Sequence, residues 1–368
     1  MKISRITTVA ALGAIAALGL TGCAANESGT PNDSGSTGEP SLSGNLVGGG
    51  ASSQEVAIAA WTKQFQTAND AVTVDYDPAG SGTGRESFAA GAFSFVGSDR
   101  AFKQDEISST EFGACAADSD IIEIPAYISP IAVIFNLEGI DSLNLDAATL
   151  AGIFTGDVSQ WNDPAIAALN EGVELPVTAI NPVHRADKSG TTGNFTDYLA
   201  AAAGDVWTHG SVEEWPIQAG ESAQGTSGVV QAVESGVGTI GYADASRAGE
   251  LGTVSVQVGD DFVPYSPEAA AAIVEHSPLD EGRTAGDLAI NLDRTSTEAG
   301  VYPIVLVSYL IGCEEYADPA QATLVKEFFS TVISAEGQSA AADAAGSAPI
   351  SDSIRQSAQS AIDLIVTE

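Results

Sequence analysis

The chain has 368 residues, and its 49 acidic residues against 13 basic ones give a formal net charge of −36. So negative a surface repels nucleic acid, which excludes that class of partner. Only 3 histidines are present, scattered without the spacing of metal ligands, so we expect neither a metal site nor a cofactor. The same charge repels small anions at long range, and an anion site would therefore need short-range hydrogen bonds in a closed cleft.

The N-terminus has the pattern of a bacterial lipoprotein signal. Lys2 and Arg5 precede an apolar run over 9–20 that is too short to remain as a membrane-spanning helix. Small residues then lead into Cys23, which predicts a removed signal peptide over 1–22 and lipid attachment at that cysteine. An ordinary secretory signal with an incidental cysteine is the alternative. The mature protein would lie outside the cytoplasm, anchored to the cell membrane by its lipid.

The segment over 23–43 is rich in Gly, Ser, Thr and Pro, and it predicts a flexible tether that begins at the lipidated cysteine. No later segment is long and apolar enough for a transmembrane helix, and 301–313 is interpreted as a buried strand. In an oxidising compartment we expect Cys115 and Cys313 to form a disulfide, with two buried free thiols as the alternative.

Beyond the tether, short apolar strands alternate with helical segments. A helix is predicted to start at Ser52, because Glu55 lies at the spacing of a capping box. Three pairs of a strand and a helix follow in chain order, at 71–76 and 85–90, at 131–135 and 147–155, and at 177–181 and 194–203. This alternation indicates an α/β fold with mostly parallel sheets.

Roughly 325 residues follow the tether, more than one hydrophobic core normally supports, so we predict two domains. The chain is expected to pass into a second lobe near 123–126 and to return near 301–304, after which a helix near 324–329 completes the first. Two crossing strands would form a hinge that allows closure around a ligand. The predicted boundaries are 44–123 plus 303–368 for lobe I and 124–302 for lobe II.

Three glycine- and hydroxyl-rich turns precede predicted helices, at 48–53, 78–84 and 184–192. A helix N-terminus offers unpaired N–H groups and a positive dipole end, and Ser and Thr add neutral donors. The third turn also holds Arg185, whose planar fork suits tetrahedral oxyanions. Because open α/β sheets bind ligands at their strand ends, the three turns together indicate a site for a small anion.

Five ordered segments resemble the substrate-binding lipoprotein of the bacterial high-affinity phosphate ABC importer. They are Gly-Gly-Ala-Ser at 49–52, Ala-Gly-Ser-Gly-Thr-Gly at 79–84, Phe-Val-Gly-Ser-Asp at 95–99, Ile-Phe-Thr-Gly at 153–156 with Trp-Asn-Asp at 161–163, and Arg-Ala-Asp-Lys-Ser-Gly-Thr at 185–191. The resemblance covers most of the chain from Gly48 onward and implies a two-lobed periplasmic-binding-protein fold of type II. It also implies inorganic phosphate as the ligand, a membrane permease and its ATPase as partners, and a monomer.

Carried over by position, the resemblance implies that phosphate contacts hydroxyls, backbone N–H groups and one cation. The implied set is Ser52, Ser53, Ser81, Asp99, Arg185, Ser189, Gly190 and Thr191, with Asp187 orienting the Arg185 guanidinium. The chain departs from the family pattern after Ser52, where Ser53 and Gln54 stand in place of the common aromatic residue and proline. A backbone donor survives this change, but the wall of the cleft becomes more polar.

Asp99 would select the ligand, because phosphate near neutral pH keeps a proton and sulfate keeps none. The carboxylate can accept a hydrogen bond from the phosphate O–H, whereas sulfate would leave it unpaired against a negative charge. Sites built to bond a substrate hydroxyl reject analogues that lack it by roughly 10⁴–10⁵. The alternative is that Asp99 only caps a helix beginning near Phe102 or Asp105.

Two other functions are alternatives: a lipoprotein that binds another oxyanion (sulfate or molybdate), and a serine-type hydrolase or phosphatase-like enzyme. Asp99 argues against the first. Against the second, no Gly-x-Ser-x-Gly elbow surrounds Ser81 or Ser189, and no His-Glu-x-x-His or phosphate-loop lysine motif occurs. We therefore expect a binding protein without catalytic residues.

Overall fold

The computed structural model describes residues 42–367. The predicted signal peptide, the predicted lipidation at Cys23 and nearly all of the predicted tether lie outside this range. Among the described residues, no helix has the length and hydrophobicity needed to cross a membrane.

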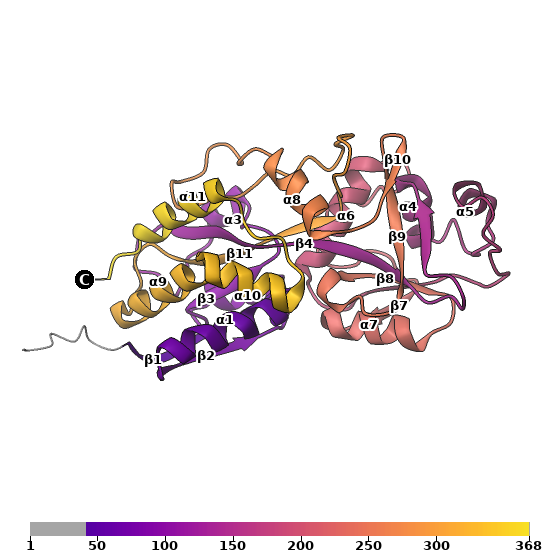
Figure 1. Cartoon of the computed structure of the whole chain (residues 1–368). Helices are drawn as coiled ribbons and strands as arrows, with labels where there is room; N and C mark the ends of the chain where they lie inside the picture. Colours follow the sequence, from indigo (N-terminus) through magenta and orange to yellow (C-terminus); the bar gives the residue numbers. More distant parts are fainter. Residues whose placement is uncertain (1–41, 368) are drawn as a thin grey trace, which may run out of the picture. The chain divides into compact units, whose positions relative to one another are not determined.

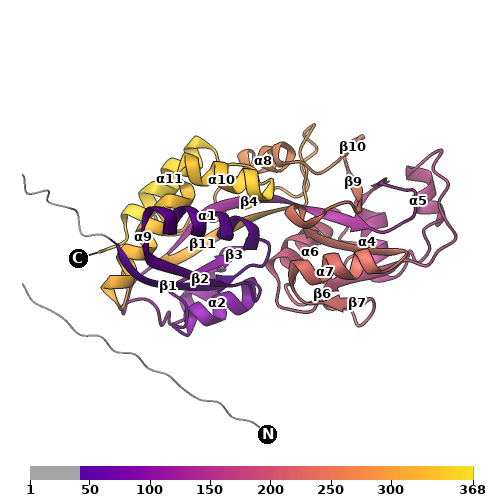
Figure 2. The same cartoon turned by 60° about the horizontal axis from the view of Figure 1, so that its bottom comes forward.

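The first part of the described chain forms three parallel strands with a helix after each. These elements are β1 (Ser43–Gly50), α1 (Glu55–Ala68), β2 (Ala71–Asp77), α2 (Ser81–Ala89), β3 (Phe95–Ser98) and α3 (Gln104–Ser109). The strands stand in the order β2-β1-β3. Helix α1 buries Ile58, Trp61 and Phe65, and Figure 2 shows α1 and α2 on opposite sides of these strands.

Two long central strands complete this sheet. β4 (Ile121–Phe135) and β11 (Val305–Cys313) pair antiparallel, and β11 also pairs with β3. β4 changes partner along its length: residues 121–130 pair with β11, whereas 131–135 pair with β8 (Thr239–Asp244). Every residue of β4 and β11 is buried, as expected of apolar strands covered on both faces. Figure 1 shows β4 running from one group of elements into the other.

The second group of elements is built around the C-terminal part of β4. It contains β5 (Ser142–Leu145), α4 (Ala147–Thr155), α5 (Pro164–Leu169), β6 (Asn181–Arg185), α6 (Gly190–Ala202), β7 (Glu221–Ala223), α7 (Gly225–Ser235), β8, η1 (Ala245–Arg247), β9 (Gly252–Val258) and β10 (Asp261–Val263). Here β6 pairs in parallel with β7 and β8, and β5 with β9. After β10 the chain returns to the first group.

α8 (Pro267–Glu275) packs against β4 before the chain enters β11. The helices that follow β11 cover the first group: α9 (Pro319–Ile333), α10 (Ala335–Ala345) and α11 (Asp352–Asp363). α9 is the helix predicted near 324–329, and it buries Phe328 and Phe329 beside α1 and β11 (Figure 1). A disulfide joins Cys115 to Cys313 at the end of β11, as predicted, with Cα atoms 5.4 Å apart.

The α/β class is confirmed, but the sheet is mixed rather than mostly parallel. The central pairs β3-β11, β11-β4 and β4-β8 are all antiparallel, because the chain runs through the middle of the molecule in both directions. The strand predicted at 177–181 is wrong, since only Asn181 belongs to β6. The capping box is also wrong: α1 begins at Glu55 after Gln54, and the Ser52 hydroxyl bonds elsewhere. Helix α4 has its predicted bounds.

Candidate anion-binding site

The glycine- and hydroxyl-rich turns meet where strands end and helices begin. Ser81 and Gly190 are the first residues of α2 and α6, so both helices begin inside their turns, earlier than predicted. Ser189 caps α6, because its Oγ accepts a hydrogen bond from the Thr192 N–H at 3.2 Å. The two turns are close: a Cβ atom added to Gly190 would lie 2.5 Å from Ser81 Oγ. Two helix N-termini thus adjoin one point, an arrangement that attracts anions.

Ser52 connects the first turn to a third helix, α7. Its Oγ lies 3.0 Å from Thr226 Oγ1 and accepts a hydrogen bond from the Thr226 N–H at 3.1 Å. Gly225, which precedes Thr226, has a φ of +67°, a conformation that favours glycine. Thr226 is absent from the predicted set, although Gly-Thr-Ser-Gly at 225–228 repeats the pattern of the other turns and is a signal that could have identified it.

Asp99 lies at the centre of these turns and is 2% exposed. Its Oδ1 accepts hydrogen bonds from Ser53 Oγ at 2.5 Å and from Ser308 Oγ at 2.7 Å, and its Oδ2 accepts one from Thr191 Oγ1 at 3.0 Å. Its backbone N–H donates to Ser81 Oγ at 3.1 Å.

The carboxyl group of Asp99 has no part in a helix cap. The neighbouring helix α3 begins after Lys103, and Glu106 accepts from the N–H of that lysine at 2.8 Å, so the capping alternative for Asp99 is wrong. Burial raises the pKa of Asp99, while the three hydroxyl donors and the charge of Arg185 oppose that rise. Among the predicted residues, Ser53 and Thr191 bond the buried Asp99 carboxyl group, and Ser81 bonds the backbone N–H of the same residue.

Arg185 lies beside this carboxyl group at the end of β6 and is itself buried. Its Nε donates to Asp187 Oδ1 at 2.8 Å, and its Nη2 pairs with Asp187 Oδ2. The remaining Nη1 donates to Thr191 Oγ1 at 3.4 Å. Burial alone would raise the pKa of Asp187, but the hydrogen bonds and charge of Arg185 lower it. Asp187 thus holds the guanidinium, as predicted, with one edge toward the hydroxyl cluster.

Ser308 is a second residue absent from the predicted set. It lies in the middle of β11 and is fully buried. A single hydroxyl inside an apolar strand gives no signal of its own, because its contact with Asp99 depends on how β3 and β11 pair. No pattern in the sequence alone could have identified it.

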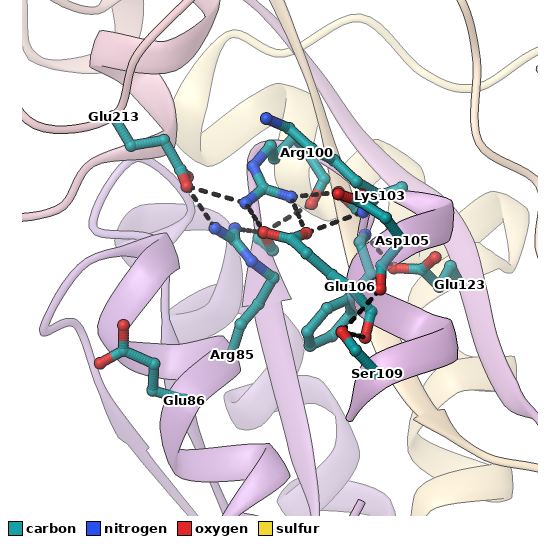
Figure 3. Close-up of polar contacts among 12 residues, drawn as sticks. Arg85, Glu86, Arg100, Lys103, Asp105, Glu106, Ser109, Glu123 and Glu213 are labelled. Carbon is teal, nitrogen blue, oxygen red and sulfur yellow. Dashed lines mark hydrogen bonds and ion pairs between the residues drawn. The ribbon is translucent and has the colours of Figure 1, made fainter. Parts of the chain in front are cut away.

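An ion-pair cluster (Arg85, Arg100, Glu106 and Glu213) lies next to the site. Figure 3 shows the four side chains and the contacts between them. Glu213 Oε2 accepts from Arg85 Nη2 at 2.5 Å and from Arg100 Nη2 at 2.9 Å, and Arg100 also pairs with Glu106. Burial would raise the pKa of Glu213, but the two arginines lower it. A cavity of about 640 Å³ opens beside Asp99, and Arg100 and Glu213 are among its lining residues.

His184 packs as a structural residue of β6. Its ring stacks on Trp215 with the ring centres 5.0 Å apart, and its Nδ1 lies 3.0 Å from the Arg185 carbonyl oxygen. Within residues 42–367, no serine hydroxyl forms a hydrogen bond with a histidine ring. This geometry gives the serine-hydrolase alternative no support.

Known proteins are similar to this chain over most of its length. A family model described as the PBP superfamily domain matches residues 35–336. The chain is 32% identical over 377 residues to the phosphate-binding protein PstS3 of Mycobacterium bovis, covering 99% of this chain and 100% of the relative. It is 34% identical over 379 residues to phosphate-binding protein PstS 3 of Mycobacterium leprae, with coverage of 99% and 100%.

Solved structures extend the likeness to the fold. A high-affinity periplasmic phosphate-binding protein (PfluDING) solved with bound phosphate matches with a TM-score of 0.70 at 20% identity, over 86% of this chain and 93% of that one. A phosphate-binding protein from Stenotrophomonas maltophilia matches with a TM-score of 0.62 at 18% identity, over 86% and 93%. The two-lobed fold is thereby confirmed. The chain belongs to the PBP superfamily and, within it, to the family of the PstS phosphate-binding proteins.

Proposed function

We propose that this chain binds inorganic phosphate outside the cytoplasm, between its two lobes, and delivers it to the permease of an ABC importer. The observation that carries the proposal is the buried Asp99 carboxyl group, which is surrounded by neutral hydroxyl donors beside Arg185. The names of the related proteins support the same ligand, since each is a phosphate-binding protein.

A bound phosphate would present charged oxygens to the donors and a protonated oxygen to Asp99. The proposed ligand set is Ser52, Ser53, Ser81, Asp99, Arg185, Ser189, Gly190 and Thr191, with Asp187 holding the Arg185 guanidinium. Sulfate has no proton to offer, so its oxygens would face the buried Asp99 carboxylate without a hydrogen bond between the two negative charges, at a cost of about 1–3 kcal/mol or more. The site would therefore select protonated tetrahedral anions, and arsenate should pass the same test.

Closure of the lobes would complete the site. The proposed lobes are 44–123 plus 303–368 and 124–302, joined by β4 and by the segment that leads into β11. Contacts between Ser52 and Thr226 and between Arg85 and Glu213 join the lobes, which supports a closed form that a ligand would favour and a permease would recognise. A permease with its ATPase, a lipid anchor at Cys23 and a monomeric state belong to the same proposal.

The test is a calorimetric titration of the soluble body, from Ser43 onward and stripped of carried-over ligand, with phosphate and then with sulfate. We expect one-to-one phosphate binding that excess sulfate does not displace. Equal binding of sulfate would leave the assigned fold unchanged but would contradict the assignment of phosphate as the selected ligand. No binding of either anion would refute the proposed function, and turnover of a phosphate ester would replace it with the enzyme alternative.

A further inference from the structure

Gln54 is a buried polar residue to which the proposed ligand set gives no role. It follows Ser53, is fully buried, and makes no side-chain hydrogen bond to the N-terminus of α1. Its Nε2 instead donates to two groups on β11: the Ser308 hydroxyl, and the Tyr309 carbonyl at 3.2 Å. The side chain thus reaches from the first turn of the site to the central strand.

These contacts fix the direction of the Ser308 hydroxyl. The Tyr309 carbonyl can only accept a hydrogen bond, so the amide nitrogen of Gln54 must face it and the adjacent Ser308 Oγ. Because Ser308 Oγ accepts from Gln54, its own hydrogen is available for Asp99 Oδ1, 2.7 Å away. A chain of donors therefore runs from Gln54 through Ser308 to Asp99.

Neutral hydroxyls donate hydrogen bonds to both oxygens of the Asp99 carboxyl group. Ser53 Oγ donates to the same Oδ1 at 2.5 Å, so this oxygen accepts two hydrogen bonds, and Thr191 donates to Oδ2. Two titratable groups interact electrostatically with the Asp99 carboxyl group: Arg185 on β6 and Tyr76 on β2.

No direct cation balances this carboxyl group. Arg85 on α2 points away from it, toward Ser98 and Glu213. Across residues 42–367, no Lys, Arg or His forms an ion pair with Asp99. The hydroxyl donors therefore carry most of the direct stabilisation of its charge.

We propose that Gln54 and Ser308 are positioning residues that keep Asp99 ionised and accepting, and thereby set the discrimination between protonated and unprotonated tetrahedral anions. This inference rests on the phosphate-binding function proposed above. Without the hydrogen bond from Ser308, the buried Asp99 carboxyl group would take up a proton more readily, because burial already disfavours its charge. A protonated carboxyl group can donate a hydrogen bond, and sulfate can accept it.

The test compares phosphate and sulfate binding by calorimetry from pH 5 to pH 8 in the soluble body and in the variants Gln54→Met and Ser308→Ala. Methionine has a similar length, removes the Nε2 donor and also removes Gln54 Oε1, which has no partner among the described residues. We expect each substitution to lower the selectivity for phosphate over sulfate by at least about tenfold. The pH below which sulfate binds should shift upward in both variants. Because Gln54 acts through Ser308, the double variant should match Ser308→Ala alone.

Ser129→Ala is the matched control, since Ser129 is also a fully buried serine, on the neighbouring strand β4, and makes no contact with Asp99. It should leave the selectivity and the pH profile unchanged. Ser308→Cys keeps a weak donor at nearly the same volume, should give an intermediate selectivity, and replaces Ser308→Ala if that variant does not fold.

Two results would overturn the inference. One is tight phosphate binding with unchanged selectivity in both Gln54→Met and Ser308→Ala, and the other is a double variant whose effect is the sum of the single ones. Failure of the unsubstituted protein to bind phosphate would instead refute the proposed function, so the two failures are distinguishable.

Discussion

Glu213→Gln should weaken phosphate binding while leaving the ligand-free protein nearly as stable. In the proposed division into lobes, Glu213 lies in the second lobe and accepts from two arginines of the first, so its charge matters when the lobes are together. In an open form water would solvate the same three side chains. The substitution should therefore destabilise the closed form, which is the form that holds the ligand.

The magnitude follows from burial. The side chains of Arg85 and Glu213 are 4% and 10% exposed, and removing one partner of a buried pair costs about 3–5 kcal/mol. Glutamine keeps a neutral acceptor worth about 1 kcal/mol. Arg100 is 21% exposed and keeps its ion pair with Glu106, so the loss of its contact with Glu213 adds little to the cost. We expect a net loss of at least about 2 kcal/mol, roughly 30-fold in Kd.

The assay is calorimetric titration with phosphate, together with thermal unfolding of the ligand-free protein. Glu214→Gln is the control, because this neighbouring residue is exposed and its substitution makes the same change in net charge. An unchanged Kd, or a Kd change matched by Glu214→Gln, would refute the reasoning. Since Arg85 and Arg100 lower the pKa of Glu213 against the effect of burial, its contribution should persist above the ordinary value of 4.5 and be lost only as pH falls through the lowered pKa.

Three further predictions concern the site and the disulfide. Asp99→Asn should relax the discrimination against sulfate in competition titrations, and unchanged discrimination would contradict the role given to this carboxyl group. Gly190→Ala should weaken phosphate binding at least tenfold, because its Cβ would lie 2.5 Å from Ser81 Oγ; wild-type affinity would mean that the turns do not approach in the bound form. Replacing Cys115 and Cys313 together with alanine should lower the free energy of unfolding by up to about 5 kcal/mol in denaturant titrations, since the disulfide closes a loop across a separation of 198 residues. No change in the midpoint would show that the pair contributes little.

Local patterns predicted the parts of the site that follow one another in sequence. Ser52, Ser81 and Ser189 each lie in a glycine- and hydroxyl-rich turn before a helix, and such turns can be recognised from the sequence alone. The capping box at Ser52 failed because a tertiary partner, Thr226, takes its hydroxyl. A local rule cannot anticipate a partner that lies 174 residues away in the sequence.

Contacts that depend on strand pairing could not be predicted from the sequence. The alternation of strands and helices predicted parallel sheets, but it says nothing about a strand that crosses between lobes, and β4 and β11 made the sheet mixed. The same pairing brings Ser308 to Asp99 and Gln54 to Ser308. Glu213 lies in an irregular segment after α6, where no motif marks it as the partner of Arg85.

The place of β11 in the sheet has a consequence for how the chain folds. β11 lies between β3 and β4, yet both of those strands precede it by roughly half the length of the chain. Until β11 is available, β3 and β4 each present an unpaired edge, and such edges favour aggregation. Contacts of such high sequence separation also slow folding. The sheet that contains β3 and β4 is therefore completed only after β11 has been made, and a chaperone that shields the two open edges would act on the nascent chain until then.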